Sequence, residues 1–264
     1  MISDLAVIHK TAQIADNVEI GPNVIIGENV KLGSGVKILG NAYLEFCEIG
    51  ENTIIHPFAT IGTAPQDLGY KNEPTKVVVG QNCLIRENVT INRAANCGDS
   101  TTTVGNKCML MTGSHVAHNC KLEDEVILAN LATLGGHVQV GFGAFIGGMG
   151  VYHQNIRIGE LAILSGFSGA RQDILPYTKN ATSCPAYSVG INVIALRRRG
   201  VSQEDRTVIN EAFKLLSSKK YNTSQAIEQI KETFLPNPYV EKMINFIQTS
   251  KRGVSIKPHK FKLH

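Results

Sequence analysis

A six-residue repeat runs through most of this chain and constrains its fold more than any other feature. An aliphatic residue recurs every six positions, usually followed by a glycine or another small or polar residue, with a small or β-branched residue four places on. The longest unbroken series runs from Val104 to Ile146. An α-helix cannot keep such a series on one face, because six residues at ~3.6 per turn rotate the position by about 240°.

Short strands separated by sharp bends do satisfy this period. Three hexads make a triangular coil of about 18 residues, and successive coils stack at the ~4.8 Å spacing of paired strands. We therefore predict a mainly β chain, with a parallel β-helix of hexapeptide repeats over residues 1–190. A prism this narrow takes Ile, Leu and Val in its core, which agrees with the absence of tryptophan.

Two internal segments and the end of the chain depart from the repeat. The stretches at about 62–78 and 92–103 lose the small corner residues, so we expect surface loops there. Residues 191–264 have helical periodicity, which predicts a C-terminal α-helical domain. Its helices are expected at Ser202 to about Ser218, from Asn222–Gln225 to about Phe234, and at Tyr239–Thr249.

Charge is unevenly distributed along the chain. Residues 1–191 hold 12 Lys+Arg and 16 Asp+Glu, whereas residues 192–264 hold 14 and 6, a net charge of +8. A basic tail behind an acidic body indicates an acidic or phosphate-bearing partner, or simply a solvated helical surface. No apolar run reaches the ~18 residues of a membrane span, so no such span is expected.

The six cysteines are typical of a reduced chain. They include no C-x-x-C pair, and the first residues lack a signal-peptide profile, so we expect a cytoplasmic protein. Cys83, Cys108 and Cys120 fall on the small-residue position of the repeat and are expected in the core. The repeat does not assign the other three, which are Cys47, Cys97 and Cys184.

Four of the eight histidines are close together in the sequence, at His115, His118, His137 and His153. With coils of about 18 residues, His137 and His153 fall within one residue of the positions stacked on His118. We therefore predict an outward ridge of imidazoles near one edge of the prism. Imidazole is a suitable general base near neutral pH and also a common zinc ligand, and spacing alone does not separate the two.

Several motifs on this framework resemble those of a known enzyme family. They are P-Q-D-L at 65–68, I-R-E-N-V-T-I at 85–91, H-V-A-H at 115–118, L-A-N-L-A-T-L-G-G-H-V at 128–138, I-G-G-M-G-V-Y-H-Q at 146–154 and G-I-N-V-I-A-L-R-R-R-G at 190–200. With the repeat and the helical tail, they make the chain resemble the UDP-N-acetylglucosamine O-acyltransferases, which catalyse the first step of lipid A biosynthesis. The resemblance covers essentially the whole chain.

This resemblance implies a fold, an assembly and a reaction. The β-helix is then left-handed, and the protein is a homotrimer with active sites between subunits. The reaction moves an (R)-3-hydroxyacyl chain from acyl carrier protein to the glucosamine 3-hydroxyl of UDP-N-acetylglucosamine. The acyl group arrives on the phosphopantetheine of the carrier, so no cofactor, metal or nucleic acid is expected.

The same resemblance implies roles for individual residues. His118 would be the general base, the Gly136 N–H would stabilise the tetrahedral oxyanion, and His137 would lie close to the thioester. The remaining positions would bind substrate: Gln66, Asp67 and His115 the sugar, His153 and Gln154 the nucleotide and acyl pocket, Asn192, Arg198 and Arg199 the UDP, and Gly166 the acyl end as a length ruler.

Four positions depart from the family pattern. They are Gly69 where Lys is frequent, Asn92 in place of His before Arg93, Asn119 where Asp often follows the base, and Ile194 where an acid is frequent. An Asn beside the base can form a hydrogen bond but supplies no negative charge to stabilise the imidazolium. These departures leave open a 3-amino sugar acceptor and an amide product.

Other functions fit parts of the pattern. The N-acyltransferase of the same pathway normally carries an extra N-terminal domain, whereas the hexads here begin by Ile8. Acetyltransferases that depend on coenzyme A generally lack the basic helical tail. A γ-type carbonic anhydrase would use three histidines on zinc, and a non-enzymatic scaffold would need neither Asp67 nor the histidine ridge.

Overall fold

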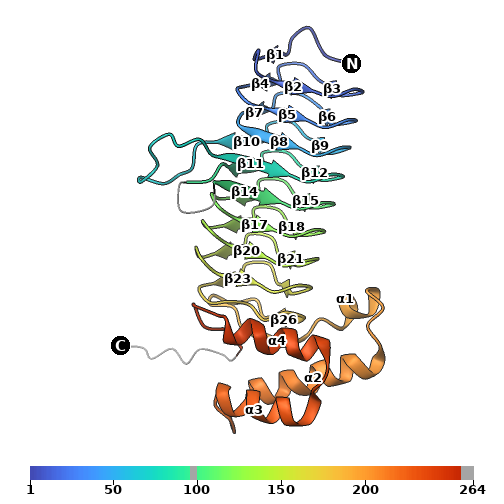
Figure 1. The fold of residues 1–264 in the computed structure, drawn as a ribbon, viewed down its shortest axis with the longest axis vertical. Helices are drawn as coiled ribbons and strands as arrows, with labels where there is room; N and C mark the ends of the chain where they lie inside the picture. The colour runs from blue at the N-terminus through green and yellow to red at the C-terminus, as the bar shows by residue number, and fades with distance from the viewer. Residues whose placement is uncertain (96–99, 257–264) are drawn as a thin grey trace.

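The computed structural model describes residues 1–95 and 100–256, which form 27 strands of two to four residues followed by four helices. The strands wind into a three-sided rod, with the helices gathered at one end (Figure 1). Three sheets run the length of the rod, and their strands pair in parallel with those of the neighbouring coils, apart from the final antiparallel pair.

Each sheet forms one face of the rod. The first contains β1 (Val7–Ile8), β4 (Ile25–Ile26), β7 (Tyr43–Leu44), β10 (Thr60–Thr63), β13 (Thr90–Asn92), β16 (His115–Val116), β19 (Thr133–Leu134), β22 (Val151–Tyr152) and β25 (Gly169–Ala170). The second contains β2 (Gln13–Ile14), β5 (Lys31–Leu32), β8 (Cys47–Ile49), β11 (Lys76–Val79), β14 (Thr101–Val104), β17 (Lys121–Leu122), β20 (Gln139–Val140) and β23 (Arg157–Ile158). The third contains β3 (Glu19–Ile20), β6 (Lys37–Ile38), β9 (Ile54–Ile55), β12 (Leu84–Ile85), β15 (Met109–Leu110), β18 (Ile127–Leu128), β21 (Phe145–Ile146), β24 (Ile163–Leu164), β26 (Thr178–Asn180) and β27 (Ser188–Ile191).

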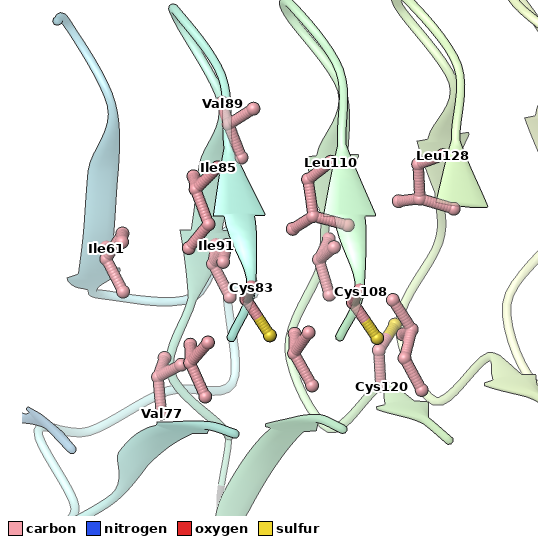
Figure 2. Packing of buried hydrophobic residues seen from close by; sticks show 14 of the residues in the cluster. Ile61, Val77, Cys83, Ile85, Val89, Ile91, Cys108, Leu110, Cys120 and Leu128 are labelled. Carbon is pink, nitrogen blue, oxygen red and sulfur yellow. The ribbon is translucent and has the colours of Figure 1, made fainter. Parts of the chain in front are cut away.

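The aliphatic hexad residues point into the rod, as the repeat predicts. Ile85, Leu110 and Leu128 stack inside on successive coils, each fully buried (Figure 2). Cys83 and Cys108 lie beside them in the small-residue position, so their predicted core placement is confirmed. Cys120 and Cys47 are buried as well, Cys184 is exposed, and Cys97 lies outside the described residues.

The corners of the rod use the left-handed backbone region. Asn29, Asn41, Asn88, Asn119 and Asn155 are among the non-glycine residues there, with φ between 48° and 63°. Asparagine tolerates this region better than most residues, because its short polar side chain can hydrogen-bond locally. Corner residues therefore set the bends, while the strand residues set the faces.

Both predicted loops are shorter in the structure. β10 continues to Thr63 and β11 begins at Lys76, so the first loop is 64–75 rather than 62–78, and it projects from the side of the rod (Figure 1). Strand pairing of Lys76–Val79 with both neighbours draws the loop ends into the sheet. The second loop is similarly bounded by β13 and β14, and its residues 96–99 lie outside the described residues.

Four helices follow the last strand: α1 (Val193–Arg198), α2 (Gln203–Ser217), α3 (Thr223–Phe234) and α4 (Pro238–Gln248). Ser202 and Asn222 cap α2 and α3, their side chains accepting the N–H groups of Asp205 and Gln225. α4 lies against the last coils, where Lys242 pairs with Glu160. None of the helices in the described part of the chain is long and apolar enough to cross a membrane.

Candidate active site

The loop at 64–75 carries Asp67 to the edge of the first sheet. The Asp67 carboxylate accepts the Gly69 N–H at 2.7 Å, and its carbonyl accepts the Tyr70 N–H at 3.1 Å, so the aspartate closes its own turn. Its other carboxylate oxygen lies 3.7 Å from Nε2 of His118. Gly69 therefore contributes to this turn through its backbone N–H. Gln66 is exposed on the same loop.

Arg93, which follows β13, anchors the base of this loop. Its guanidinium donates to the Glu45 carboxylate at 2.8 Å, to the Gly62 carbonyl at 2.7 Å and to the Tyr70 hydroxyl at 2.9 Å. It also lies over the rings of Phe46 and Tyr70. Arg93 is 8% exposed, so these contacts form a largely desolvated clamp between the loop base and the coil.

Asn119 determines which nitrogen of His118 carries a proton. The Asn119 amide nitrogen donates to the Ala95 carbonyl at 3.0 Å, and its Oδ1 accepts the Ala95 N–H at 3.0 Å. That orientation leaves Oδ1, an acceptor, 2.9 Å from Nδ1 of His118. We assign Nδ1 as the donor, because an amide oxygen cannot donate. Nε2 of His118 is then the basic nitrogen, and it points away from Asn119.

Gly136 lies directly beneath that basic nitrogen. A Cβ added at Gly136 would come within 2.5 Å of Nε2 and 2.6 Å of Cε1 of His118. Residue 136 is one coil beyond residue 118, which is why a side chain there would meet the ring. A glycine at this position therefore leaves room for the His118 ring beside the backbone of the next coil.

Two further histidines border His118. The His137 ring packs edge-on against the His118 ring, with centroids 5.2 Å apart. Burial, together with the nearby His118, lowers the pKa of His137 below the ordinary value. Burial likewise lowers the pKa of His115, whose Nδ1 lies 2.7 Å from the Thr90 hydroxyl. Both rings are thus favoured as neutral groups that donate or accept hydrogen bonds.

The structure brings only some residues of the predicted histidine ridge close together. His153 and Gln154 lie one coil beyond His137, exposed at the surface, and they contact Arg252 from the end of the chain. Gly166 lies at another corner of the rod, after β24, where an added Cβ would come within 3.3 Å of the Gly148 carbonyl oxygen. That contact is closer than ordinary van der Waals contact, so a side chain at 166 requires a small shift of the neighbouring backbone.

The three residues predicted to bind UDP lie on a different face from the histidines. Asn192, Arg198 and Arg199 line a cavity of about 870 Å³ between α1 and the outer surface of the third sheet, and His118 is not among its lining residues. Arg199 pairs with Glu125 and lies over the Phe142 ring. On a single chain the predicted site residues therefore form two separate groups, which we call half-sites, and these groups do not share one cavity.

The repeat and the motifs did not point to every residue of these half-sites. Three of them make contacts between distant parts of the chain, which no local pattern reveals. The sequence separations are 48 positions for Arg93, 74 for Glu125 and 99 for Arg252. Within the described residues, no group of three or more His, Cys, Asp or Glu side chains is arranged to hold a metal ion.

Comparison with known proteins places this geometry in a family. The model for UDP-N-acetylglucosamine O-acyltransferase, domain 2, matches residues 173–255, and that for the GMPPB C-terminal domain matches residues 2–64. A protein of Thermodesulfovibrio yellowstonii, named acyl-[acyl-carrier-protein]–UDP-N-acetylglucosamine O-acyltransferase, is 44% identical over 207 residues, or 78% of this chain and 80% of that protein. The chain belongs to the UDP-N-acetylglucosamine O-acyltransferase family. It is therefore an acyltransferase.

Solved structures of the family superpose on almost the whole chain. The UDP-N-acetylglucosamine acyltransferase of Bacteroides fragilis is 38% identical, covers 96% of this chain and 99% of its own, and gives a TM-score of 0.93. The Acinetobacter baumannii structure is 36% identical, with coverages of 96% and 98% and a TM-score of 0.92. The predicted left-handed β-helix with a C-terminal helical domain is thereby confirmed.

Proposed function

We propose that this protein transfers an (R)-3-hydroxyacyl chain from acyl carrier protein to the 3-hydroxyl of the glucosamine in UDP-N-acetylglucosamine, the first step of lipid A biosynthesis. Relatives 39–44% identical are named for that donor and acceptor. The observation that carries the proposal is the pairing of His118 Nε2 with the Gly136 backbone on adjacent coils. It suits acyl transfer, which needs a base and an oxyanion donor at one point.

The proposed chemistry begins with His118. Its Nε2 removes the proton of the sugar 3-hydroxyl as that oxygen attacks the thioester carbonyl carbon. The Gly136 N–H donates to the carbonyl oxygen as it becomes an oxyanion. The intermediate then collapses: the C–S bond breaks, the ester forms, and the imidazolium returns its proton to the departing phosphopantetheine sulfur. A positioned base contributes roughly 10²–10⁴ in rate, and one oxyanion donor about 10²–10³.

Asn119 performs the orienting part of the role that a carboxylate plays beside many catalytic histidines. Its Oδ1 holds the Nδ1–H of His118, which keeps Nε2 free to accept the substrate proton. An amide does not stabilise the imidazolium as a carboxylate would. Asp67, whose carboxylate is 3.7 Å from Nε2, supplies a negative charge on the substrate side instead.

The substrates are proposed to span both half-sites. Asp67, His115 and the adjacent Gln66 hold the sugar, and His137, favoured as neutral, lies beside the thioester. The diphosphate binds in the cavity with Asn192, Arg198 and Arg199, because guanidinium groups match phosphate oxygens. His153 and Gln154 contact the nucleotide, and Gly166 lies at the acyl end. The reaction needs no cofactor besides the carrier-bound acyl group.

A homotrimer would join the two half-sites, and the faces of the rod support one. Outward residues of the third sheet form an apolar, half-buried column on six consecutive coils: Ile54, Leu84, Met109, Ile127, Phe145 and Ile163. The second sheet instead presents Lys121, Gln139 and Arg157. An apolar face of that length on a folded protein is typical of a subunit contact.

The cysteines suit a reducing compartment. Cys47, Cys83, Cys108 and Cys120 are free and buried, as in proteins kept reduced in the cytoplasm. We therefore place the enzyme there, together with its carrier protein.

Product analysis tests the proposal directly. The protein is incubated with UDP-N-acetylglucosamine or its 3-amino analogue and a panel of (R)-3-hydroxyacyl carrier proteins, and the products are identified by mass spectrometry. We expect an ester of UDP-N-acetylglucosamine, and we expect His118→Ala to abolish it while oligomeric state and melting temperature are retained. An amide formed only on the amino analogue would overturn the acceptor, and turnover of His118→Ala within a few-fold would remove the proposed base.

A further inference from the structure

The chain returns to the β-helix after its last helix. Beyond α4, the Asp173 N–H donates to the Gly253 carbonyl and the Ser255 N–H donates to the Asp173 carbonyl, both at 2.9 Å. Asp173 and Val254 thereby form a parallel bridge. The segment 249–256 is therefore fastened along the last coils rather than extending away from them.

A buried ionic contact fixes the same segment. The Asp173 side chain is almost completely buried and accepts hydrogen bonds from Arg157 Nε and the Ser250 hydroxyl, both at 2.8 Å. Arg157 also donates to the Phe246 carbonyl at 2.7 Å and to the Thr249 hydroxyl at 3.0 Å. A buried carboxylate held by several donors restrains the groups around it, so the residues that follow Ser250 have a defined position.

That position brings Arg252 to two predicted substrate-binding residues. One guanidinium nitrogen of Arg252 lies 3.0 Å from Nδ1 of His153 and 2.9 Å from the Gln154 carbonyl oxygen. Nδ1 of His153 also lies 3.1 Å from the Gln154 carbonyl oxygen, which can only accept, whereas the guanidinium is always protonated and can only donate. The Arg252 nitrogen has two hydrogens, one for that carbonyl oxygen and one for Nδ1, and a protonated Nδ1 would set its N–H against this cation. We therefore assign Nδ1 of His153 as an acceptor. Nε2 of His153 then carries the proton in the neutral ring.

We propose that Arg252 is a positioning residue of the active site, which fixes His153 as a neutral Nε2–H donor to the nucleotide of the sugar substrate. This inference rests on the proposed function, in which His153 and Gln154 contact that nucleotide. By holding the ring and the adjacent carbonyl together, Arg252 presets the orientation that the ligand needs. The helical domain therefore completes a site built on the β-helix.

A spectroscopic test reports on the tautomer without any turnover. Long-range proton–nitrogen correlation spectra of histidine-labelled protein distinguish protonated from unprotonated ring nitrogens, and His153→Ala identifies the His153 signals. We expect Nδ1 of His153 to be unprotonated in the wild-type protein and a mixture of tautomers in Arg252→Met. A protonated Nδ1 in the neutral ring of the wild-type protein would overturn the proposal.

Kinetics test whether the orientation matters for the substrate. Arg252→Met should raise KM for UDP-N-acetylglucosamine roughly 5- to 10-fold, as expected for loss of one charge-assisted hydrogen bond, with kcat changed less than about twofold. Arg252→Lys should recover part of that loss. Lys251→Met is the matched control, because it removes the same charge from the adjacent exposed residue, and its KM should stay unchanged.

A double variant separates positioning from direct contact with the ligand. In a His153→Ala background, Arg252→Met should have no further effect on KM if Arg252 acts through the ring. A full additional loss would show that Arg252 acts independently of His153 and would overturn the proposal. If neither the wild-type protein nor any variant forms the product, the proposed function is wrong. The tautomer measurement still decides the role of Arg252 toward His153 in that case.

Discussion

The imidazole of His118 lies against the backbone of Gly136 on the next coil, so closely that a methyl group on Gly136 would come within 2.5 Å of Nε2. Residues 118 and 136 are 18 positions apart and stack on successive coils, and the next coil is joined in turn by the Asn155 N–H, which donates to the Gly136 carbonyl. The rod thus holds the His118 imidazole beside the Gly136 backbone without any flexible segment between them.

Gly136→Ala should therefore remove activity without unfolding the protein. The new methyl group displaces the His118 ring, which can swing outward, so we expect kcat to fall about 100-fold or more. Circular dichroism melting should show little change. Gly190→Ala is the control, since an added Cβ there meets nothing within 4 Å. Normal turnover by Gly136→Ala would contradict the proposed geometry.

Substitutions of Asn119 should separate orientation from charge. Asn119→Ala removes the acceptor for Nδ1–H of His118 and for the Ala95 N–H, so kcat should fall at least about tenfold. Asn119→Asp keeps an acceptor and adds a charge that stabilises the imidazolium. The acidic limb of its pH–rate profile should therefore move to higher pH. An unshifted profile would contradict the contact, and Asn130→Ala serves as an exposed control.

The half-buried His115 should make folding stability depend on pH. Its pKa in the folded protein is lowered from 6.5, mainly by burial, so the unfolded chain binds more protons as the pH falls. The contribution of His115 to the free energy of unfolding should be fully present above pH 6.5. It should decrease as the pH falls from there through the pKa of His115 in the folded protein. Melting curves measured between about pH 5.5 and 7.5 should show a weaker dependence of the melting temperature on pH in His115→Gln than in the wild-type protein. If the melting temperature of His115→Gln changed with pH as much as that of the wild-type protein, His115 would not be the cause of the pH dependence.

The proposed trimer contact can be tested on two faces of one chain. Phe145→Glu places a charge in the outward apolar column of the third sheet, whereas Gln139→Glu makes the same addition on the outer face of the second. Burying an unpaired carboxylate is unfavourable, so only Phe145→Glu should dissociate the oligomer in light-scattering measurements. Dissociation by Gln139→Glu alone would place the contact on the other face.

The hexad pattern was sufficient to predict the architecture, because each strand obeys a local rule: aliphatic inward, small near the corner. The caps Ser202 and Asn222 located α2 and α3 for the same reason. α1 was not predicted as a separate element, since it spans only six residues. Its cap, Asn192, had been considered only as a nucleotide ligand.

The site was predicted less completely than the fold. Coil spacing brought His118 and His137 together, but it could not show that His153 would contact Arg252 from the end of the chain. Arg93 was likewise missed as the anchor of the Asp67 loop, because Glu45 and Tyr70 are distant in sequence. Pairings of this kind depend on where long segments fold back, which hexad spacing does not encode.

One coil is a residue shorter than its neighbours, and its shortening is absorbed at a corner. Lys31 pairs with Glu48, 17 positions on, whereas Gln13 pairs with Lys31, 18 positions on, and the alternation of inner and outer side chains is unchanged. A residue lost at this bend thus leaves inward residues paired with inward residues, and outward with outward, on the following coil. The alignment of His118 over Gly136 therefore depends on the coil that joins these two residues and not on the length of the coils before it.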